Sequence, residues 1–471
     1  MDLPLEFVSY TRQLMGENLF SHLAEGLESP PSVSIRLNPC KSEGMNVSSD
    51  LDEGPVAWCS EGRYLATRPN FTFDPFLHAG VYYVQDASSM FLSHVLHQYV
   101  THPVEMLDLC AAPGGKSTAA LSSLPSGSFL VANEPIPLRA QILAENIQKW
   151  GMSEAAVTNN YPSDFERLGI TFDIILADVP CSGEGMFRKD PDSIAEWSVQ
   201  NVENCRILQR QIVESAWHCL RPGGLLVYST CTLNARENEE NVEWIVNELG
   251  AIPQPVNIET SWGITPPLTG TIPYCYRFIP GVARGEGLFM CVLRKPGTLS
   301  QQSGKTKSKP RREKGKNKNN STEHLSAVSH WLSPSDGFVL RQSGNNIYAI
   351  PRNGEAIYDK LLTMKVLHAG VHCAVIKGRD LVPQQSLALS SHLHKDAFAE
   401  ASLEYPEAIS YLRKESITLP PNTPRGFVQV TYKGHTLGFV KNIGSRSNNL
   451  YPTEWKIRSG HTPEHQTEIL K

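Results

Sequence analysis

Short apolar runs alternate with longer amphipathic segments between residues 104 and 295. The apolar runs have the length of buried strands, and the segments between them repeat apolar residues at intervals of three and four, as helices do. Strands that alternate with helices form a parallel sheet covered on both faces, and such a sheet binds its ligand at the carboxyl ends of its strands. We therefore predict a Rossmann-like α/β domain with strands at 104–110, 128–134, 155–160, 172–179 and 224–232.

A polar, basic segment at 298–323 interrupts this pattern. It is nearly free of apolar side chains and cannot bury enough surface to fold alone, so we predict a flexible linker. Short helical patterns and turns precede the α/β domain, and alternating apolar residues with glycine turns end the chain, as in β-structure. We predict an N-terminal subdomain at 1–100, the α/β domain at 101–297, the linker at 298–323, an intermediate C-terminal α+β domain at 324–418 and a β-rich domain at 419–471.

The composition agrees with several folded domains, since the 471 residues are 40% hydrophobic and 19% charged. The net charge of −5 argues, taken alone, against a nucleic-acid binder, whose surface is usually basic. The charge is segregated, however: residues 304–319 carry +7, which leaves −12 on the rest of the chain. The linker is therefore either a solubilising tether or a segment that adds salt-sensitive affinity for RNA.

Ten cysteines are scattered through the chain without a CxxC pair or a Cys/His cluster at zinc spacing. This distribution favours reduced thiols in a cytoplasmic protein and gives no reason to expect a metal. The N-terminus has no secretory signal pattern, and no apolar run approaches the length of a membrane span. We expect a soluble, cytoplasmic, monomeric protein that does not contact membranes.

The sequence MLDLCAAPGGKST, residues 106–118, runs from a strand through a glycine loop into a helix. Such a loop brings main-chain amides close to a ligand at the positive end of the helix. A phosphate-binding P-loop requires a glycine five positions before Gly115, and that position is Cys110, so the spacing excludes a P-loop. A site for a nucleoside cofactor remains, as does the simpler interpretation that the glycines only form a tight turn.

Glu134 ends the next predicted strand, 26 residues after Asp108. An acid at this place in a Rossmann-like sheet accepts hydrogen bonds from ribose hydroxyls. The loop lacks the full G-x-G-x-x-G pattern of a dinucleotide site, which favours a mononucleoside such as S-adenosylmethionine. The sequence thus favours a nucleoside-cofactor site at this edge of the sheet.

Cys181 and Cys231 each lie just past the end of a predicted strand, in polar, turn-rich surroundings. A single cysteine is usually a small buried hydrophobe, but two at the same edge of a parallel sheet can lie side by side. Carbon 5 of cytosine is too weak a nucleophile to take a methyl group directly, and a thiolate that adds to carbon 6 activates it. A carboxyl group such as that of Asp178 supports the ring nitrogens, and a second thiol assists loss of the carbon 5 proton or release of the adduct.

The chain resembles the Nop/Sun-type RNA cytosine-C5 methyltransferases in motifs between residues 106 and 241. These motifs are LCAAPGGKST, the acid Glu134, ADVPCSGEG and YSTCTLNARENEE, with similar flanks in SIRLNP, YYVQDASSM and MFRKDPD. The resemblance implies a Rossmann-like core, S-adenosyl-L-methionine as cofactor and RNA as substrate. It makes Cys231 the nucleophile and gives Cys181 a role in product release. It places the cofactor contacts on Cys110, Ala111, Ala112, Pro113, Gly114, Gly115, Lys116, Glu134 and Asp178.

Two departures from the family pattern stand out. The usual D-A-P-C-S-G has Val179 in place of its alanine, and the acid that often follows the third strand to meet the adenine is replaced by Asn159 and Asn160. An asparagine can still hydrogen-bond adenine, so the residue in that role stays open.

Two rival methyltransferase types fit less well. The ENV motif of DNA cytosine methyltransferases is spelled at 240–242, but inside an apolar stripe typical of a helix. An adenine amino-methyltransferase fits less well still, because the residue after Pro180 is Cys181 and not a proline that leads to a stacking aromatic residue.

The C-terminal segment 434–460 combines basic and aromatic residues, which suits RNA contact. It is similar to the PUA-like end of the bacterial ribosomal RNA small-subunit methyltransferase F group, and the N-terminal subdomain is then RNA-binding as well. This resemblance implies 5-methylcytosine formation in ribosomal RNA, with 16S RNA of the small subunit as the expected substrate. The alternatives are a transfer-RNA substrate and a non-catalytic ribosome-assembly factor. Further candidates for RNA contact are Arg188, Lys189, Lys441, Arg446, Tyr451, Trp455, Lys456 and Arg458.

Overall fold

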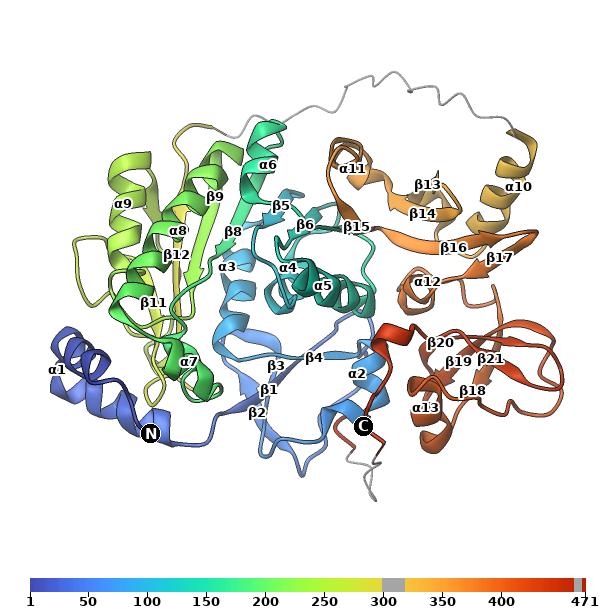
Figure 1. Ribbon diagram of the computed structural model, residues 1–471, viewed down its shortest axis with the longest axis horizontal. Helices are drawn as coiled ribbons and strands as arrows, with labels where there is room; N and C mark the ends of the chain where they lie inside the picture. The colour runs from blue at the N-terminus through green and yellow to red at the C-terminus, as the bar shows by residue number, and fades with distance from the viewer. Residues whose placement is uncertain (299–317, 461–467) are drawn as a thin grey trace.

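A mixed sheet of nine strands forms the centre of the protein in a computed structural model, which describes residues 1–298, 318–460 and 468–471 (Figure 1). The strand order is β10-β12-β9-β8-β5-β6-β7-β15, with β11 beside β12. Five strands are parallel, as the sequence predicts: β5 (Glu105–Asp108), β6 (Phe129–Asn133), β7 (Ala155–Thr158), β8 (Phe172–Asp178) and β9 (Leu220–Thr230). The antiparallel strands are β10 (Ile252–Gln254), β11 (Cys275–Phe278), β12 (Leu288–Arg294) and β15 (Val366–Ala369).

Helices cover both faces of the sheet because successive strand residues point to opposite sides. Leu130 and Ala132 of β6 lie in the core under one set of helices, whereas Phe129 and Val131 lie in the core under the other. The first set is α3 (Phe91–Tyr99), α4 (Gly115–Ser123) and α5 (Pro137–Trp150). The second is α6 (Pro162–Arg167), α8 (Val199–Cys219), α9 (Glu239–Leu249) and α11 (Glu355–Leu361). The predicted Rossmann-like fold is thus confirmed.

The N-terminal region consists of a long helix and a small sheet. Helix α1 (Leu5–Glu28) has a kink at Gly16 and packs through Phe7 against Phe187 and Trp197 of the α/β domain. The sheet has the order β2-β3-β1-β4 and lies beside α4 and α5 (Figure 1). Its strands are β1 (Val33–Leu37), β2 (Asp52–Val56), β3 (Cys59–Leu65) and β4 (Tyr82–Val84), and the short helix α2 (Pro75–Ala79) precedes β4. A second short helix, α7 (Pro191–Glu196), belongs to the α/β domain, where it lies between β8 and α8.

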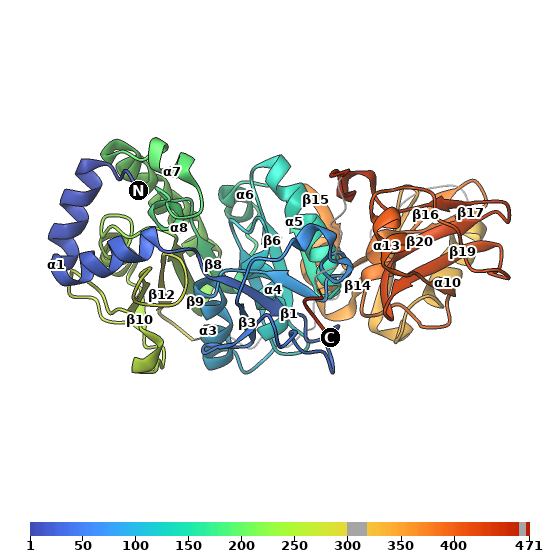
Figure 2. The same cartoon turned by 90° about the horizontal axis from the view of Figure 1, so that it is seen from below.

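Two further four-stranded sheets form the C-terminal region, at the opposite end of the molecule from α1 (Figure 2). The first contains β13 (Phe338–Ser343), β14 (Asn346–Pro351), β16 (Val371–Lys377) and β17 (Asp380–Pro383). The second contains β18 (Ala399–Ser402), β19 (Gly426–Tyr432), β20 (His435–Asn442) and β21 (Ser447–Asn449). The helices of this region are α10 (Lys318–Ser329), α11, α12 (Gln385–Leu389) and α13 (Tyr405–Leu412).

The C-terminal region divides differently from the sequence-based boundaries. Most of the predicted linker lies outside the described residues, and α10 begins at Lys318, before the expected end of the linker. Strand β18 pairs with β19, so the last sheet begins before the expected boundary at residue 419. The sequence of β18, AEAS, is short, and its only apolar residues are alanines, which have a low strand propensity. Strand β15, which the sequence assigns to the intermediate domain, pairs with β7 and is part of the central sheet.

The chain end returns to the N-terminal region, where Lys471 and Asn46 exchange two main-chain hydrogen bonds of 2.9 Å. Residues of the N-terminal sheet and of the last sheet also share one hydrophobic core, in which Phe76 packs against Tyr432. Among the helices of the described residues, none has the length and hydropathy needed to cross a bilayer.

Candidate active site

The loop between β5 and α4 holds most of the predicted cofactor residues. Gly114, the residue that precedes α4, has a φ of 116°, a left-handed backbone conformation that favours glycine. Asp108, at the end of β5, is fully buried and its Oδ2 accepts a 2.6 Å hydrogen bond from Ser117 Oγ. A cavity of about 200 Å³ lies against the loop. Seven of the nine predicted residues line it: Cys110, Ala111, Ala112, Pro113, Gly115, Lys116 and Asp178.

Glu134 lies at the end of β6, the strand next to the loop. Its side chain is 1% exposed, and its Oε1 accepts a hydrogen bond of 3.0 Å from the main-chain amide of Ile136. Its Oε2 has no hydrogen-bond partner, although Arg139 Nη1 lies 3.8 Å away. A buried carboxylate oxygen without a donor is costly unless a ligand supplies one, and ribose hydroxyls do so.

The N-terminal region completes the cavity with a residue that the sequence analysis missed. Gln85, directly after β4, lines the cavity, and its Oε1 accepts a 2.7 Å hydrogen bond from Arg36 Nε. Arg36 also donates to Thr118 of α4 at 2.6 Å, so it fixes Gln85 relative to the glycine loop. The amide nitrogen Nε2 of Gln85 is buried and has no partner. It therefore remains available as a donor to a polar group in the cavity.

The two predicted thiols lie side by side. The parallel strands β8 and β9 end together, with Asp178 opposite Ser229, so the following loops bring the Sγ atoms of Cys181 and Cys231 to 2.9 Å. Asp178 Oδ2 accepts from Lys116 Nζ at 2.8 Å, and its Oδ1 accepts from Ser229 Oγ at 2.7 Å. The arrangement thus joins a thiol pair, a carboxylate and an ammonium group beside the cavity.

The ionisation of these groups is coupled. The hydrogen bond with Cys231, together with burial, raises the pKa of Cys181 well above that of an ordinary thiol. Burial lowers the pKa of Lys116, but the nearby charges of Asp178 and Cys231 outweigh it and leave this pKa raised. Cys181 is therefore a protonated donor at neutral pH, and Lys116 is a cation close to both Asp178 and Cys231.

Two buried glutamates hold the thiol loops together, and the sequence analysis missed both. Glu184 Oε2 accepts from the amides of Leu233 and Asn234, each at 2.8 Å, and its Oε1 accepts from Trp197 Nε1 at 2.9 Å. Glu237 Oε2 accepts from the amide of Ser182 at 3.0 Å, and burial raises the pKa of Glu237 to about 7. Each glutamate belongs to one thiol loop and binds the other.

A close approach of the two loops requires glycine at one position. The amide of Gly185 donates to the carbonyl oxygen of Cys231 at 2.7 Å. A Cβ atom at residue 185 would lie 2.4 Å from that oxygen and 2.8 Å from the carbonyl oxygen of Gly287. Only glycine at position 185 therefore allows this main-chain hydrogen bond, which fixes the position of Cys231 relative to the loop that carries Cys181.

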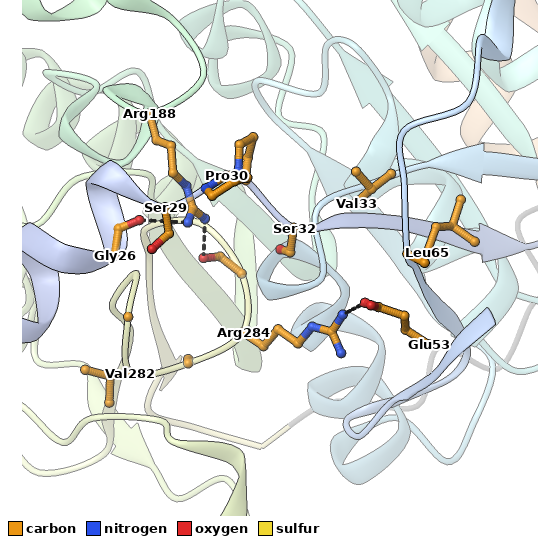
Figure 3. A pocket seen from close by; sticks show the side chains of 15 residues that line it. Gly26, Ser29, Pro30, Ser32, Val33, Glu53, Leu65, Arg188, Val282 and Arg284 are labelled. Atoms are coloured by element: carbon orange, nitrogen blue, oxygen red, sulfur yellow. Dashed lines mark hydrogen bonds and ion pairs between the residues drawn. The ribbon is translucent and has the colours of Figure 1, made fainter. Parts of the chain in front are cut away.

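Arg188 has a structural role instead of the predicted phosphate contact. Its guanidinium binds Glu286 Oε1 at 2.8 Å and the carbonyl oxygen of Gly285 at 3.1 Å. It also binds the carbonyl oxygen of Gly26 at 2.9 Å (Figure 3). It lies in the wall of a second cavity of about 470 Å³, which opens beside the ion pair of Arg284 with Glu53 (Figure 3). Neither arginine has a free charge to offer a phosphate there.

The aromatic residues of the C-terminal segment are core residues. Tyr451 is completely buried against Tyr411, and Trp455 packs on Tyr451 and beneath Lys149. Lys441 pairs with Asp380 at 2.7 Å. The exposed basic residues of the segment are Arg446, Lys456 and Arg458.

Comparison with known proteins agrees with this architecture. A family model described as 16S rRNA methyltransferase RsmB/F matches residues 98–294. The models for the N-terminal domain of 16S rRNA methyltransferase RsmF and for the methyltransferase RsmF PUA domain match residues 3–87 and 398–457. The ribosomal RNA small subunit methyltransferase F of Citrobacter koseri is 30% identical over 97% of both chains. The chain belongs to the ribosomal RNA small subunit methyltransferase F family.

Other similar proteins extend the comparison. The ribosomal RNA small subunit methyltransferase F of an Enterobacter species is 30% identical over 97% of this chain and 96% of its own. A structure titled NSun6 from Pyrococcus horikoshii with SFG has a TM-score of 0.52 and 21% identity, covering 63% of this chain and 99% of that chain. A methyltransferase homolog from the same organism has a TM-score of 0.52 and 27% identity, covering 62% and 94%.

Membership of the methyltransferase F family confirms that the protein is a methyltransferase and that its cofactor is S-adenosyl-L-methionine. The residues present fit this cofactor, because Gln85 Nε2 and Asp108 Oδ1 are buried polar atoms without partners in residues that line the cavity. Glu134 Oε2, at the end of the neighbouring strand β6, is a third such atom. S-adenosylmethionine has polar groups at both ends, and these groups can form hydrogen bonds with the three buried polar atoms. No group of three metal-ligating side chains occurs within residues 1–298, 318–460 and 468–471.

Replacing Gln85 with leucine should weaken cofactor binding by about tenfold, because it removes a buried donor to the cavity. Isothermal titration calorimetry with S-adenosylmethionine measures this change. Gln200→Leu, an exposed position on α8, is the matched control and should bind as the wild type does. Equal affinities for the Gln85 variant and the wild type would show that Gln85 does not contact the cofactor.

Proposed function

We propose that the protein forms 5-methylcytosine in 16S RNA of the small ribosomal subunit, through a covalent adduct of Cys231 with carbon 6 of cytosine. The 2.9 Å contact between the Sγ atoms of Cys181 and Cys231, beside Lys116 and Asp178, is the observation that carries this proposal. The relatives are ribosomal RNA small subunit methyltransferases F, which supports ribosomal RNA as the substrate class. A target base must leave its stack to reach these groups.

The proposed cofactor residues surround the cavity beside the thiols. Glu134 accepts hydrogen bonds from the ribose, and Gln85 and the glycine loop bind the polar remainder of the cofactor. Bound there, the cofactor supplies an electrophilic methyl group. The proposed set is Cys110, Ala111, Ala112, Pro113, Gly114, Gly115, Lys116, Glu134 and Asp178.

Cys231 is the nucleophile in this proposal because a hydrogen-bond donor and a cation lie beside its sulfur. Cys181 stays protonated and donates its S–H to Cys231 Sγ, while Lys116 supplies a nearby positive charge. A hydrogen-bond donor and a cation both stabilise a thiolate. The thiolate forms a C–S bond to carbon 6, and the electron pair of the C5–C6 double bond makes carbon 5 nucleophilic.

Asp178 supports the charge that develops on the pyrimidine ring. Lys116 donates a hydrogen bond to one oxygen of its carboxylate, and Ser229 donates one to the other. The remaining lone pairs of these oxygens can accept the amino protons of cytosine. This contact also selects cytosine, since uracil has a carbonyl oxygen at the same position. Carbon 5 then takes the methyl group.

Cys181 assists release of the product. The hydrogen bond with Cys231 is the main reason why the pKa of Cys181 is raised, and this bond is lost when Cys231 becomes a thioether. A thioether is only a weak acceptor, so Cys181 can release its proton to solvent, and its thiolate then removes the carbon 5 proton. Loss of that proton restores the C5–C6 double bond, breaks the C–S bond and returns Cys231 as a thiolate.

The RNA-facing surface is proposed to include the exposed basic residues Arg446, Lys456 and Arg458 of the C-terminal region. The N-terminal subdomain contributes the second side of the catalytic cavity through Gln85. Phosphate contacts of this kind position RNA without reading its sequence.

Incubation with labelled S-adenosylmethionine and, separately, 30S subunits, naked 16S RNA or transfer RNA tests this function. We expect label in one of the two ribosomal substrates, and nucleoside analysis by mass spectrometry should identify 5-methylcytosine. Label in transfer RNA alone would favour a transfer-RNA methyltransferase. Absence of label from all three would favour a non-catalytic assembly factor, and label on another base or atom would refute the chemistry.

A further inference from the structure

The end of β7 departs from the family pattern at Asn159 and Asn160, and neither side chain is free to meet a cofactor. Asn159 Nδ2 donates to the carbonyl oxygens of Glu134 and Pro135, at 2.8 and 2.9 Å. Asn160 Nδ2 donates to the carbonyl oxygen of Lys365 at 3.1 Å, and its Oδ1 accepts from the amide of Lys365 at 3.2 Å. The two amides therefore connect parts of the protein instead of recognising adenine.

Lys365 comes from the C-terminal region, directly before β15. Its carbonyl oxygen accepts from the amide of Asn159 at 2.9 Å, and its Nζ donates to Asn159 Oδ1 at 2.6 Å. With the two contacts to Asn160, this one residue makes four hydrogen bonds to the end of β7. The contact through Nζ is the one that depends on the side chain, and its charge makes it stronger than a neutral hydrogen bond.

These contacts form a continuous path to the ribose-binding acid. Lys365 holds Asn159 through Oδ1, and the Nδ2 of the same amide holds the carbonyl oxygens of Glu134 and Pro135. A cation on the oxygen of an amide polarises it and strengthens its N–H donors. The buried carboxylate of Glu134, with its unpartnered Oε2, therefore depends on the ammonium group of Lys365 for its position.

We propose that Lys365 is a positioning residue of the cofactor site, by which the C-terminal region fixes the ends of β6 and β7 for S-adenosylmethionine. The inference rests on the proposed contact of Glu134 with the cofactor ribose. It gives the C-terminal region a part in cofactor binding besides its contact with RNA. The region is built into the catalytic sheet at this point, since β15 pairs with β7.

The test measures cofactor affinity of the full-length protein by isothermal titration calorimetry, and the KM for cofactor and kcat by methyl transfer. Lys365→Met removes the charged donor but keeps the aliphatic chain, and should raise the Kd for S-adenosylmethionine about tenfold. We expect kcat at saturating cofactor and the Kd for RNA to stay unchanged. Lys365→Arg keeps a charged donor and should restore most of the affinity. Lys360→Met, at an exposed position of α11, is the matched control.

Two further variants separate the possible outcomes. Asn159→Ala should weaken binding as Lys365→Met does, and the double variant should be no weaker than either, because both interrupt one path. Glu134→Gln tests the proposed ribose contact itself. If Glu134→Gln weakens binding and Lys365→Met does not, the positioning role is refuted while the cofactor site stands. If neither Glu134→Gln nor Lys365→Met weakens cofactor binding, the ribose contact of Glu134 and the positioning role of Lys365 are both refuted. A lowered melting temperature with unchanged Kd would also refute the proposal, since it is what a purely structural contact produces.

Discussion

Replacing Cys231 with alanine should lower methyl transfer to RNA by about 10⁴-fold or more, because no other group can activate carbon 5. Cys181 lies 2.9 Å from Cys231, but in the proposed mechanism it acts on the carbon 5 proton and does not attack carbon 6. Single-turnover transfer of labelled methyl groups measures the loss.

The companion variant Cys181→Ala should still form the adduct and transfer the methyl group, but it should fail to release the product from Cys231. Its Cys231 still adds to the base, so a covalent protein–RNA species should accumulate and migrate as a slower band on a denaturing gel. Cys231→Ala should give no such band. Cys40→Ala, an exposed thiol remote from the site, should behave as the wild type does. If Cys231→Ala still transfers the methyl group and Cys181→Ala does not, Cys181 is the nucleophile and Cys231 assists product release.

Replacing Glu184 with alanine should destabilise the protein more than any surface change. The carboxylate is fully buried and accepts hydrogen bonds from Trp197, Leu233 and Asn234, which would be left without an acceptor. Loss of a buried charged acceptor costs about 3–5 kcal/mol. We expect the melting temperature to fall by about 6 °C or more in differential scanning calorimetry.

Methyl transfer measured below that melting temperature should also fall, since Glu184 holds the loops that carry both thiols. Glu184→Gln keeps the shape and one acceptor oxygen, so it should lie between the alanine variant and the wild type. Glu196→Ala removes an exposed carboxylate and should leave the melting temperature unchanged. A wild-type melting temperature for Glu184→Ala would mean that water or rearranged side chains satisfy the three donors.

The parallel sheet could be predicted because β6 and β8 contain the apolar runs FLVA and IILA, which are typical of strands buried on both faces. The proximity of Cys181 and Cys231 could be predicted for a related reason, as neighbouring parallel strands end at the same edge. The sheet and the proximity of the two cysteines were both inferred from the residues of single short segments. Such inferences succeed where the local sequence pattern agrees with the tertiary structure.

The remaining site residues gave no such local signal. Glu184 and Glu237 are acids in glycine- and asparagine-rich turns, where exposed acids are common, and only the donors of the opposite loop make their burial possible. Gln85 reaches the cavity from a different sheet. Tyr451 and Trp455 combine with basic neighbours in a pattern that suits RNA contact, yet they pack in a core shared with the N-terminal region. Each depends on contacts between distant parts of the chain.

The pairing of β15 with β7 also has a consequence for synthesis of the protein. Thr158 ends β7, and roughly 200 residues must be translated before Val366 begins the strand that covers its outer edge. At about 5–20 residues per second, the nascent chain carries that uncovered edge for about 10–40 s. An uncovered strand edge is a template for aggregation, so the emerging chain is exposed to it until nearly four-fifths of the protein has left the ribosome.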